Sequence, residues 1–483
     1  MFRRLPSGLW IVLGLALLLR VGWGLTRSSS NAAIDALPDQ REYLSIARSI
    51  LGGRGAQFFD ERFKQTVYAY RMPGYSWLIA ACGCDPRVVR GLQALLDTST
   101  VLAVFLLARR VLEPREANDG LGGLAAAPQG RASENVSLHC AMMHQDLPLE
   151  SRPFGAAAKR VLEPLRSRQM SPPLLAALLV ATNPFLIYFS GLLLSETLFA
   201  AMLVWGMLLL LSSARRRMLW ILGAILLAIS IYVRPSALLL PVILAFASAL
   251  AGARRLGSGS PSPSTPGEGA REGALVARRR IHGNIKPAVY RAALAGVLIV
   301  AALFPWARRN SQPSVLGCWI WTTTNGGITA YDGWNPIADG GSNQAFLRNM
   351  PELSGMGEIQ RSDYLAGRAR EFVMHHPLRA VKLAFVKLAR LWSPMPLSEQ
   401  YSSPAYRAVG LLYCVPFDLL VLAGLIRGKL TPAAKVFLLL PAIYLTVVHV
   451  ASVGSLRYLL PAIPPMGVLA GSLFSRPRFG RRG

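Results

Sequence analysis

The chain alternates between long apolar runs and shorter segments that carry most of its charged side chains. Several apolar runs reach about eighteen residues with almost no charge, which is enough for a helix to cross a hydrocarbon core of about 30 Å. A transmembrane barrel would instead alternate apolar and polar residues over short strands. The pattern therefore predicts an all-α integral membrane protein.

Ten apolar runs are candidate spans. In chain order they are Leu9–Leu25, Val88–Val111, Pro173–Phe189, Leu193–Leu211, Met218–Val233, Ala237–Ala251, Ala292–Trp306, Ala408–Ile426, Val436–Val450 and Tyr458–Phe474. The first run follows two arginines, as a signal peptide would, but no small-residue cleavage site follows it cleanly, so we expect a retained anchor. Ten spans place both termini on the same side of the membrane.

The distribution of charge indicates on which side of the membrane each loop lies. The formal net charge is +27, and the basic residues cluster in short segments at the ends of apolar runs. Such clusters are typical of cytoplasmic loops, and in the ten-span arrangement they all fall on the side of the termini. We therefore expect a multi-pass protein of the cell membrane with both termini in the cytoplasm. A nucleic-acid partner is not expected, because no single basic patch or stripe is evident.

The loops divide the chain into five segments. Residues 1–111 hold two spans and an outer loop, 112–172 form an irregular cytoplasmic insert, and 173–252 hold four spans. Residues 253–288 are basic and rich in Gly, Ser and Pro, which predicts a flexible linker. Residues 289–483 hold four spans and a second outer loop, 307–405. Each outer loop contains an amphipathic stretch, at 41–51 and at 377–392, and the second is typical of an interfacial helix.

Candidate site residues gather on the predicted outer face. Charged side chains near the ends of membrane spans cost free energy unless they are paired or hydrated, so a group of them indicates a functional site. They are Asp39, Glu42, Arg71 and Tyr75 in the first outer loop, Glu196 and Arg234 at outer turns, Arg309 and Asn310 after the seventh span, and Arg457 and Tyr458 at the start of the tenth.

Five stretches of sequence carry a family resemblance. They are PDQREYLSIARSILGGRG with YRMPGYSWLIA, NPFLIYFSGLLLSETLF, YVRPSALLLP, FPWARRNSQPSVLG with WTTTNGGITAYDGWNP, and SLRYLLPAIPP. In this order they resemble the bacterial relatives of the dolichyl-phosphate-mannose protein mannosyltransferases, a group that also includes the lipid A aminoarabinose transferases. That group belongs to the C-type glycosyltransferase superfamily.

The resemblance implies a glycosyltransferase that uses a polyprenyl-phosphate sugar, with Asp39 as the catalytic acid or base. Many relatives carry an adjacent Asp-Glu pair in the first outer loop, whereas Gln40 and Arg41 separate Asp39 from Glu42 here. At the start of a helix this spacing still places both carboxylates near one face. Glu42 is therefore retained beside Asp39 as a second catalytic candidate.

The chemistry of such a transfer needs the same residue types. A carboxylate can take the proton of the acceptor hydroxyl, and cations must stabilise the charge that develops on the leaving lipid phosphate. Arg71, Arg309 and Arg457 suit this role because a guanidinium group binds phosphate oxygens in a forked geometry. Tyr75, Glu196, Arg234, Asn310 and Tyr458 are expected to support the substrate site.

Simpler roles remain open at these positions. Asp39 could cap the helix that begins near Arg41, Glu196 could only pair with an arginine, and Arg234 and Arg457 could extend toward the membrane interface. At the level of the whole chain, a transporter or flippase of a lipid-linked sugar and a non-catalytic assembly partner are the alternatives. Transporters tend to show inverted repeats and ionisable groups at mid-membrane, and we see no repeat of that scale.

The sequence leaves several partners undefined. The acceptor could be a glycan, a lipid or a protein, and the surrounding membrane lipid is a further partner. No Cys or His spacing typical of a metal site is present, so the sequence assigns no metal ligands and leaves the need for a divalent metal open.

Overall fold

A computed structural model describes residues 5–112, 170–212, 217–253, 269–397 and 403–475. Most of the predicted insert 112–172 lies outside the described residues, and so does the first part of the predicted linker. The described residues up to Leu112 and from Pro172 onward belong to one unit of contacting elements. They are mostly helical, with a single two-stranded antiparallel hairpin among them.

The elements up to residue 253 are as follows. They comprise α1 (Ser7–Leu25), α2 (Asn31–Asp35), α3 (Pro38–Leu51), β1 (Phe58–Asp60), β2 (Gln65–Val67), α4 (Gly74–Ala81), α5 (Pro86–Leu112), α7 (Pro172–Ala181), α8 (Pro184–Ser190), α9 (Glu196–Leu210), α10 (Arg217–Ile229), η2 (Ser230–Tyr232), η3 (Pro235–Ala237) and α11 (Leu240–Ala253). In the hairpin, Phe58 pairs with Val67 and Asp60 pairs with Gln65.

The second half of the chain follows the same helical plan. It comprises α12 (Gly269–Asn310), α13 (Gly326–Gly333), η4 (Gln344–Asn349), η5 (Pro351–Gly355), α14 (Glu358–His375), α15 (Pro377–Leu391), α16 (Pro404–Arg427), α17 (Pro432–Val450), α18 (Leu456–Leu459), η7 (Leu460–Ala462) and α19 (Ile463–Ser472). Below, residues 26–85 are called the first loop and residues 311–403 the second loop.

Five of the described helices are long and apolar enough to cross a membrane. They are α1, α5, the Ile285–Asn310 part of α12, α16 and α17. The pair α7 and α8 would make a sixth span, although the two helices meet at an angle of 51°. The all-α membrane class is therefore supported, while the count of ten spans stays a prediction: α9, α10 with η2, and η3 with α11 are apolar but shorter.

The bend between α7 and α8 has a local cause. Pro184 has no backbone N–H and disfavours the helical conformation of the residue before it. Asn183 accordingly adopts an extended conformation, and its Oδ1 accepts hydrogen bonds from the N–H groups of Phe185 and Leu186, both at 3.1 Å. A new helix therefore starts at Pro184, within a run that the sequence pattern predicts as one span.

The start of α12 differs from the linker expected at 253–288. The helix begins at Gly269, after the Gly/Ser/Pro run, and continues without a break to Asn310. Residues 270–281 include Ala, Glu, Arg and Leu, which favour helix. The average composition of 253–288 does not show this change from a Gly/Ser/Pro run to residues that favour a helix.

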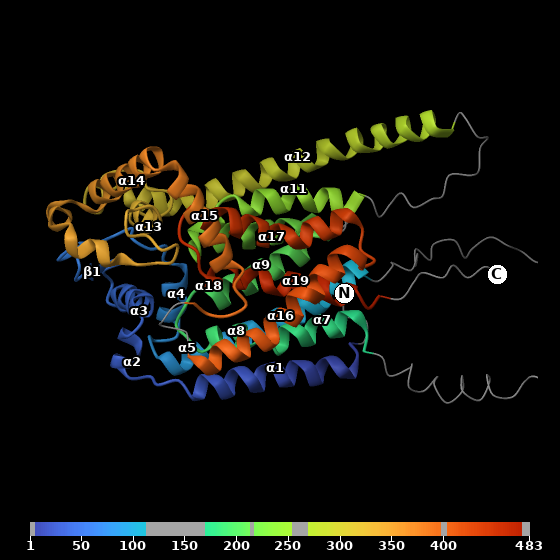
Figure 1. Cartoon of the computed structure of the whole chain (residues 1–483), viewed down its shortest axis with the longest axis horizontal. Coiled ribbons are helices and arrows are strands. Elements are labelled where there is room, and N and C mark those ends of the chain that lie inside the picture. The colour runs from blue at the N-terminus through green and yellow to red at the C-terminus, as the bar shows by residue number, and fades with distance from the viewer. Residues whose placement is uncertain (1–4, 113–169, 213–216, 254–268, 398–402, 476–483) are drawn as a thin grey trace, which may run out of the picture. The chain divides into compact units, whose positions relative to one another are not determined.

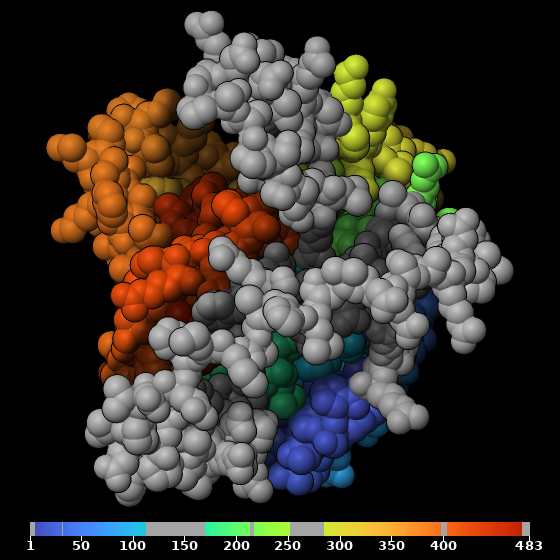
Figure 2. Space-filling view, turned by 90° about the vertical axis from the view of Figure 1, so that its right-hand side faces the viewer, coloured from blue at the N-terminus to red at the C-terminus, as the bar shows by residue number. Residues whose placement is uncertain are grey.

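Three clusters of buried apolar side chains organise the unit. One joins α1, α5, α7, α16, α17 and α19, so the first and last parts of the chain pack in the same layer. Figure 2 shows residues of both parts, in blue and in orange-red, on one face with α7 in green between them. A second cluster joins α3 and α4 to α9, α10 and α11. A third fills the space between the two loops and α12.

The two loops pack against each other at one end of the helices (Figure 1). Glu358, at the start of α14, accepts hydrogen bonds from the N–H groups of Tyr68 at 2.7 Å and Ala69 at 3.0 Å, and from the hydroxyl of Thr324. The N–H of Thr324 in turn donates to the carbonyl of Ala69 at 2.9 Å. These bonds hold the second loop over the first and fix the walls of the cavity between them.

Both predicted amphipathic helices are present as α3 and α15. Leu44, Ile46, Ala47 and four polar or aromatic neighbours make up the buried face of α3. In α15, Ala380, Leu383 and Leu391 are buried, whereas Leu378 and Phe385 remain 86% and 68% exposed. An apolar face of α15 is therefore exposed beside the helix bundle, and its position at the membrane interface stays a prediction.

Candidate functional site

A cavity of about 760 Å³ lies between the two loops and the helix ends beneath them. Its lining from the first loop includes Asp39, Glu42, Arg62, Tyr70 and Arg71. The remainder comes from α8, the turn after η2, the second loop, the start of α16 and residues 449–458. The volume lies within the range of sites that hold small-molecule ligands, about 300–1,000 Å³.

The start of α3 places Asp39 and Glu42 on the cavity wall. Leu37 is extended and Pro38 is the first helical residue, a favoured place for proline because its missing N–H would be unpaired there. Asp39 thus lies inside the first turn, and Leu37, not Asp39, is the capping residue. Three residues later Glu42 lies on the same face. Asp39 therefore does not cap this helix.

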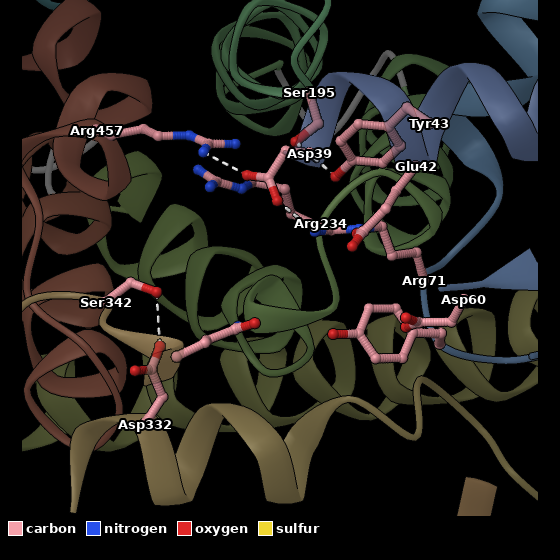
Figure 3. A network of polar contacts seen from close by, with 12 residues as sticks. Asp39, Glu42, Tyr43, Asp60, Arg71, Ser195, Arg234, Asp332, Ser342 and Arg457 are labelled. Atoms are coloured by element: carbon pink, nitrogen blue, oxygen red, sulfur yellow. Dashed lines mark hydrogen bonds and ion pairs between the residues drawn. The ribbon is translucent and has the colours of Figure 1, made fainter. Parts of the chain in front are cut away.

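Arg71 and Arg457 approach the carboxylate of Asp39 from two sides (Figure 3). Nη2 of Arg71 donates to one oxygen of Asp39, and Nη1 of Arg457 donates to the other at 2.5 Å. Nε of Arg71 also donates to Glu42, and the second oxygen of Glu42 accepts from Arg62 at 3.0 Å. One arginine therefore bridges the two carboxylates that the sequence spacing predicted to be neighbours.

Glu196, the first residue of α9, continues this network below the cavity. Its Oε1 accepts from Nε of Arg457 and, at 3.3 Å, from Nη2 of Arg234. The side chain is 2% exposed, so it is a buried counter-ion for two arginines. Arg234 also lies with its guanidinium 5.4 Å from the ring centroid of Tyr458. One cluster of charged side chains therefore brings together residues that are far apart in the sequence: Asp39, Glu196, Arg234 and Arg457.

The environments of the two first-loop carboxylates differ. Burial alone would raise the pKa of Asp39, but Arg71 and Arg457 outweigh it and hold that pKa well below its usual range. Burial dominates at Glu42 and raises its pKa, although Arg71 and Arg62 oppose the shift. The Asp39 side chain is 28% exposed and that of Glu42 only 3%. Asp39 is therefore the carboxylate that a molecule in the cavity can reach.

Three predicted site residues point elsewhere. Arg309 donates to the carbonyls of Tyr68 at 3.0 Å and Ala56 at 2.9 Å, and Asn310 donates to the carbonyl of Ile320 at 3.0 Å. None of the cavity lining comes from this end of α12. The prediction of Arg309 as a phosphate ligand is therefore not supported, because its guanidinium is used to brace the first loop.

Tyr75 is also away from the cavity. It is fully buried, and its hydroxyl donates to the side-chain oxygen of Gln93 in α5. Its ring packs edge-on against Tyr43, with 5.0 Å between ring centroids. Tyr75 therefore supports the wall behind Asp39 and Glu42 and does not contact the cavity itself.

Several lining residues were not expected from the sequence. Arg62, in the turn of the hairpin, binds Asp60 at 2.7 Å and Gln344 at 2.8 Å besides Glu42. The second loop contributes Asp332 and Ser342, which are linked by a hydrogen bond of 2.6 Å. A run of polar residues in a long loop gives no periodic signal, and only the contact between the loops brings these side chains to the site.

Metal ligation finds no support among the described side chains. No group of three or more His, Cys, Asp or Glu residues stands close enough to hold a metal ion in this part of the chain. Asp39 and Glu42 are instead paired with arginines, which supply positive charge beside these two carboxylates.

Comparison with known proteins gives two structural matches. No family model and no curated protein matches the chain. It is similar to the oligosaccharyltransferase AglB from Archaeoglobus fulgidus in complex with an inhibitory peptide and a dolichol-phosphate, at 12% identity and a TM-score of 0.49. It is also similar to an oligosaccharyltransferase of the same organism tethered with an acceptor peptide, at 12% identity and a TM-score of 0.43. Each match covers 96% of this chain and 49% of the other, so the chain spans about half the length of these proteins.

Proposed function

We propose that this chain is a membrane glycosyltransferase that moves a sugar from a polyprenyl-phosphate donor to an acceptor hydroxyl on the outer face of the cell membrane. The observation that carries the proposal is the position of Asp39. It is an accessible carboxylate on the wall of a polar cavity, and two arginines reach its two oxygens. The family resemblance of the five sequence stretches supports the same assignment.

The arginines are suited to the phosphate of the donor. Arg71 and Arg457 line the cavity, and Nη1 of Arg234 is buried without a hydrogen-bond partner. Guanidinium groups bind phosphate oxygens with two parallel hydrogen bonds. A phosphate that enters the cavity would take over part of the contacts now made to Asp39. The charge that develops on the leaving phosphate would then be stabilised by arginines already in place, which lowers the barrier to reaction.

The same exchange would prepare Asp39 for catalysis. While both arginines contact it, Asp39 has a strongly lowered pKa and is a weak base. Once the phosphate binds the arginines, their effect on Asp39 weakens and its basicity rises. Asp39 then accepts the proton of the acceptor hydroxyl as the acceptor oxygen bonds to the anomeric carbon. The bond from that carbon to the phosphate oxygen breaks, and its electron pair stays on the phosphate.

The apolar part of the lining is suited to the lipid tail. Phe185 and Phe189 of α8 and Val409 of α16 line the cavity beside Leu397 of the second loop. Apolar side chains at this wall would accompany an isoprenoid chain from the reaction centre toward the surrounding membrane lipid. The polar head and the apolar tail of one donor would therefore meet two walls of matching chemistry.

The function is tested with purified protein in lipid nanodiscs and a synthetic farnesyl-phosphate sugar. We expect release of farnesyl phosphate and attachment of the sugar to a component of an envelope extract, identified by mass spectrometry. A flippase would move the donor between leaflets without cleaving it, and an assembly partner would do neither. Comparison of surface glycans and lipids with and without the gene would then identify the acceptor as a glycan, a lipid or a protein.

The proposed side of the membrane has a separate test. Reporter fusions after residues 150, 270 and 480 should report the cytoplasm, and fusions at 60 and 340 should report the outside, because basic loops are retained on the cytoplasmic side. An outward-facing fusion at 270 would contradict the side assigned to the cavity without affecting its chemistry.

A further inference from the structure

The cavity has a second polar wall, contributed by the second loop. Figure 3 shows Asp332 and Ser342 across the cavity from Asp39 and Arg457. Asn325, Asp339 and Asn343 line the same wall. None of these side chains takes part in the arginine network described above, so the wall is free for another part of the reaction.

Asp332 is held in one orientation on this wall. One carboxylate oxygen accepts from the Ser342 hydroxyl at 2.6 Å and the other from the N–H of Asn343 at 2.7 Å. Asp332 is 2% exposed yet lines the cavity. Each oxygen has a further lone pair that these bonds do not use. Burial raises the pKa of Asp332 to about 6, so the group is mostly ionised at neutral pH.

Gly340 allows the second loop to turn tightly beside α15. Gly340 has a φ of +87°, in the left-handed region that side chains other than glycine rarely adopt. A Cβ at this position would lie 2.8 Å from Val386 of α15. The tight turn at Gly340 therefore directs Ser342 and Asn343 toward Asp332.

Several buried polar atoms around the cavity have no hydrogen-bond partner in the described part of the chain. Oδ1 of Asn325 and Nε of Arg390 are buried without a hydrogen-bond partner, and so are both ring nitrogens of His449. His449 is 7% exposed and lines the cavity. Buried polar atoms in proteins are nearly always hydrogen-bonded. Their location in one cavity therefore points to a bound molecule with many donors and acceptors.

We propose that this wall is the acceptor subsite and that it takes a hydroxyl-rich sugar ring, with Asp332 accepting a hydrogen bond from one of its hydroxyls. This inference rests on the proposed function, since it places the acceptor opposite the donor phosphate. Sugar hydroxyls both donate and accept, and the wall presents amides, a hydroxyl and a carboxylate at short intervals. A serine- or threonine-bearing peptide is the competing acceptor and an outcome of the test.

The test measures binding without catalysis. Saturation-transfer NMR on the full chain in nanodiscs is run with a panel of methyl glycosides and with short Ser- and Thr-containing peptides as probes. Binding of at least one glycoside is expected. Asp332→Asn should weaken it roughly tenfold to a hundredfold, the effect of losing a hydrogen bond to a charged group. Ser342→Ala removes one hydroxyl of the wall and one of the two hydrogen bonds that orient the Asp332 carboxylate but keeps that carboxylate, so it should weaken glycoside binding less.

The matched control is Asp363→Asn, an exposed residue of α14 outside the cavity lining. Farnesyl phosphate binding is measured for each variant, and it should be unchanged in Asp332→Asn, which also shows that this variant is folded. Failure of the wild-type protein to bind farnesyl phosphate would count against the proposed function itself. Glycoside binding that is absent, or that persists unchanged in Asp332→Asn, would overturn the acceptor subsite, and selective binding of the peptides would overturn its sugar specificity.

Discussion

Replacement of Arg457 by lysine tests how the cavity holds a phosphate. Arg457 donates through Nε to Glu196 and through Nη1 to Asp39, and its side chain is only 10% exposed. A lysine keeps the charge but has one ammonium on a flexible stem, so it cannot hold a fixed forked geometry. We expect Arg457→Lys to lose at least one charge-assisted hydrogen bond to the donor phosphate.

The size of the effect follows from that loss. A hydrogen bond to a charged group contributes about 1.5–3 kcal/mol, and screening is weak at this level of burial. The variant should therefore lose roughly tenfold to a hundredfold in kcat/KM for the synthetic farnesyl-phosphate sugar, because each 1.4 kcal/mol is a factor of about ten. Part of the loss should appear in KM, since the arginine contacts the phosphate in the ground state as well.

The assay compares steady-state transfer by the wild-type protein, Arg457→Lys and a control, Arg368→Lys. Arg368 is half-exposed on α14 and makes only a 3.9 Å contact with Glu371. The control should keep wild-type kinetics. If Arg457→Lys also retained normal kcat/KM for the lipid-phosphate donor, Arg457 would not be a phosphate ligand, and the argument from forked geometry would fail.

Two further predictions concern stability. Glu196→Gln should lower the melting temperature in nanodiscs, because breaking a buried ion pair costs about 3–5 kcal/mol. The control Glu371→Gln changes an exposed side chain and should leave the melting temperature unchanged. Equal melting temperatures for the two variants would refute the role of Glu196 as a buried counter-ion. Lys387 is fully buried without a hydrogen-bond partner for Nζ, and burial lowers its pKa from 10.5 to about 7 despite Asp332. Between pH 7 and 10 this side chain therefore binds fewer protons in the folded protein than in the unfolded chain, so its contribution to stability should rise with pH in that window. Lys387→Met should abolish this rise, and an identical slope in wild type and variant would contradict it.

The sequence predicted the cluster of charged residues at the cavity better than the rest of its lining. Asp39 and Glu42 could be paired from their spacing on a helix, and Arg71, Glu196, Arg234 and Arg457 from their common place at the ends of apolar runs. Position at a helix end does not set the direction of a side chain. Arg309 therefore passed the same criterion although it binds carbonyls of the first loop.

The missing parts depend on contacts between distant segments. Asp332 and Ser342 reach the cavity because Glu358 and Thr324 fasten the second loop to the first, and a loop of this kind shows no hydrophobic period. The fold shows the same difference between what the sequence pattern predicts and what it does not. Apolar length predicted the helical membrane class, whereas the new helix at Pro184 and the start of α12 at Gly269 depend on single local signals inside longer patterns.

The central claim is that Asp39 is the base of a sugar transfer from a lipid phosphate, and Asp39→Asn tests it most directly. Asparagine has nearly the same shape and can still accept a hydrogen bond from Arg457, but it cannot take up a proton as a carboxylate does. At saturating farnesyl-phosphate sugar, turnover should fall roughly 100-fold to 10,000-fold, with normal membrane expression and with Asp35→Asn, an exposed neighbour in α2, fully active. Near-normal turnover of Asp39→Asn would contradict the claim and move the search to Glu42.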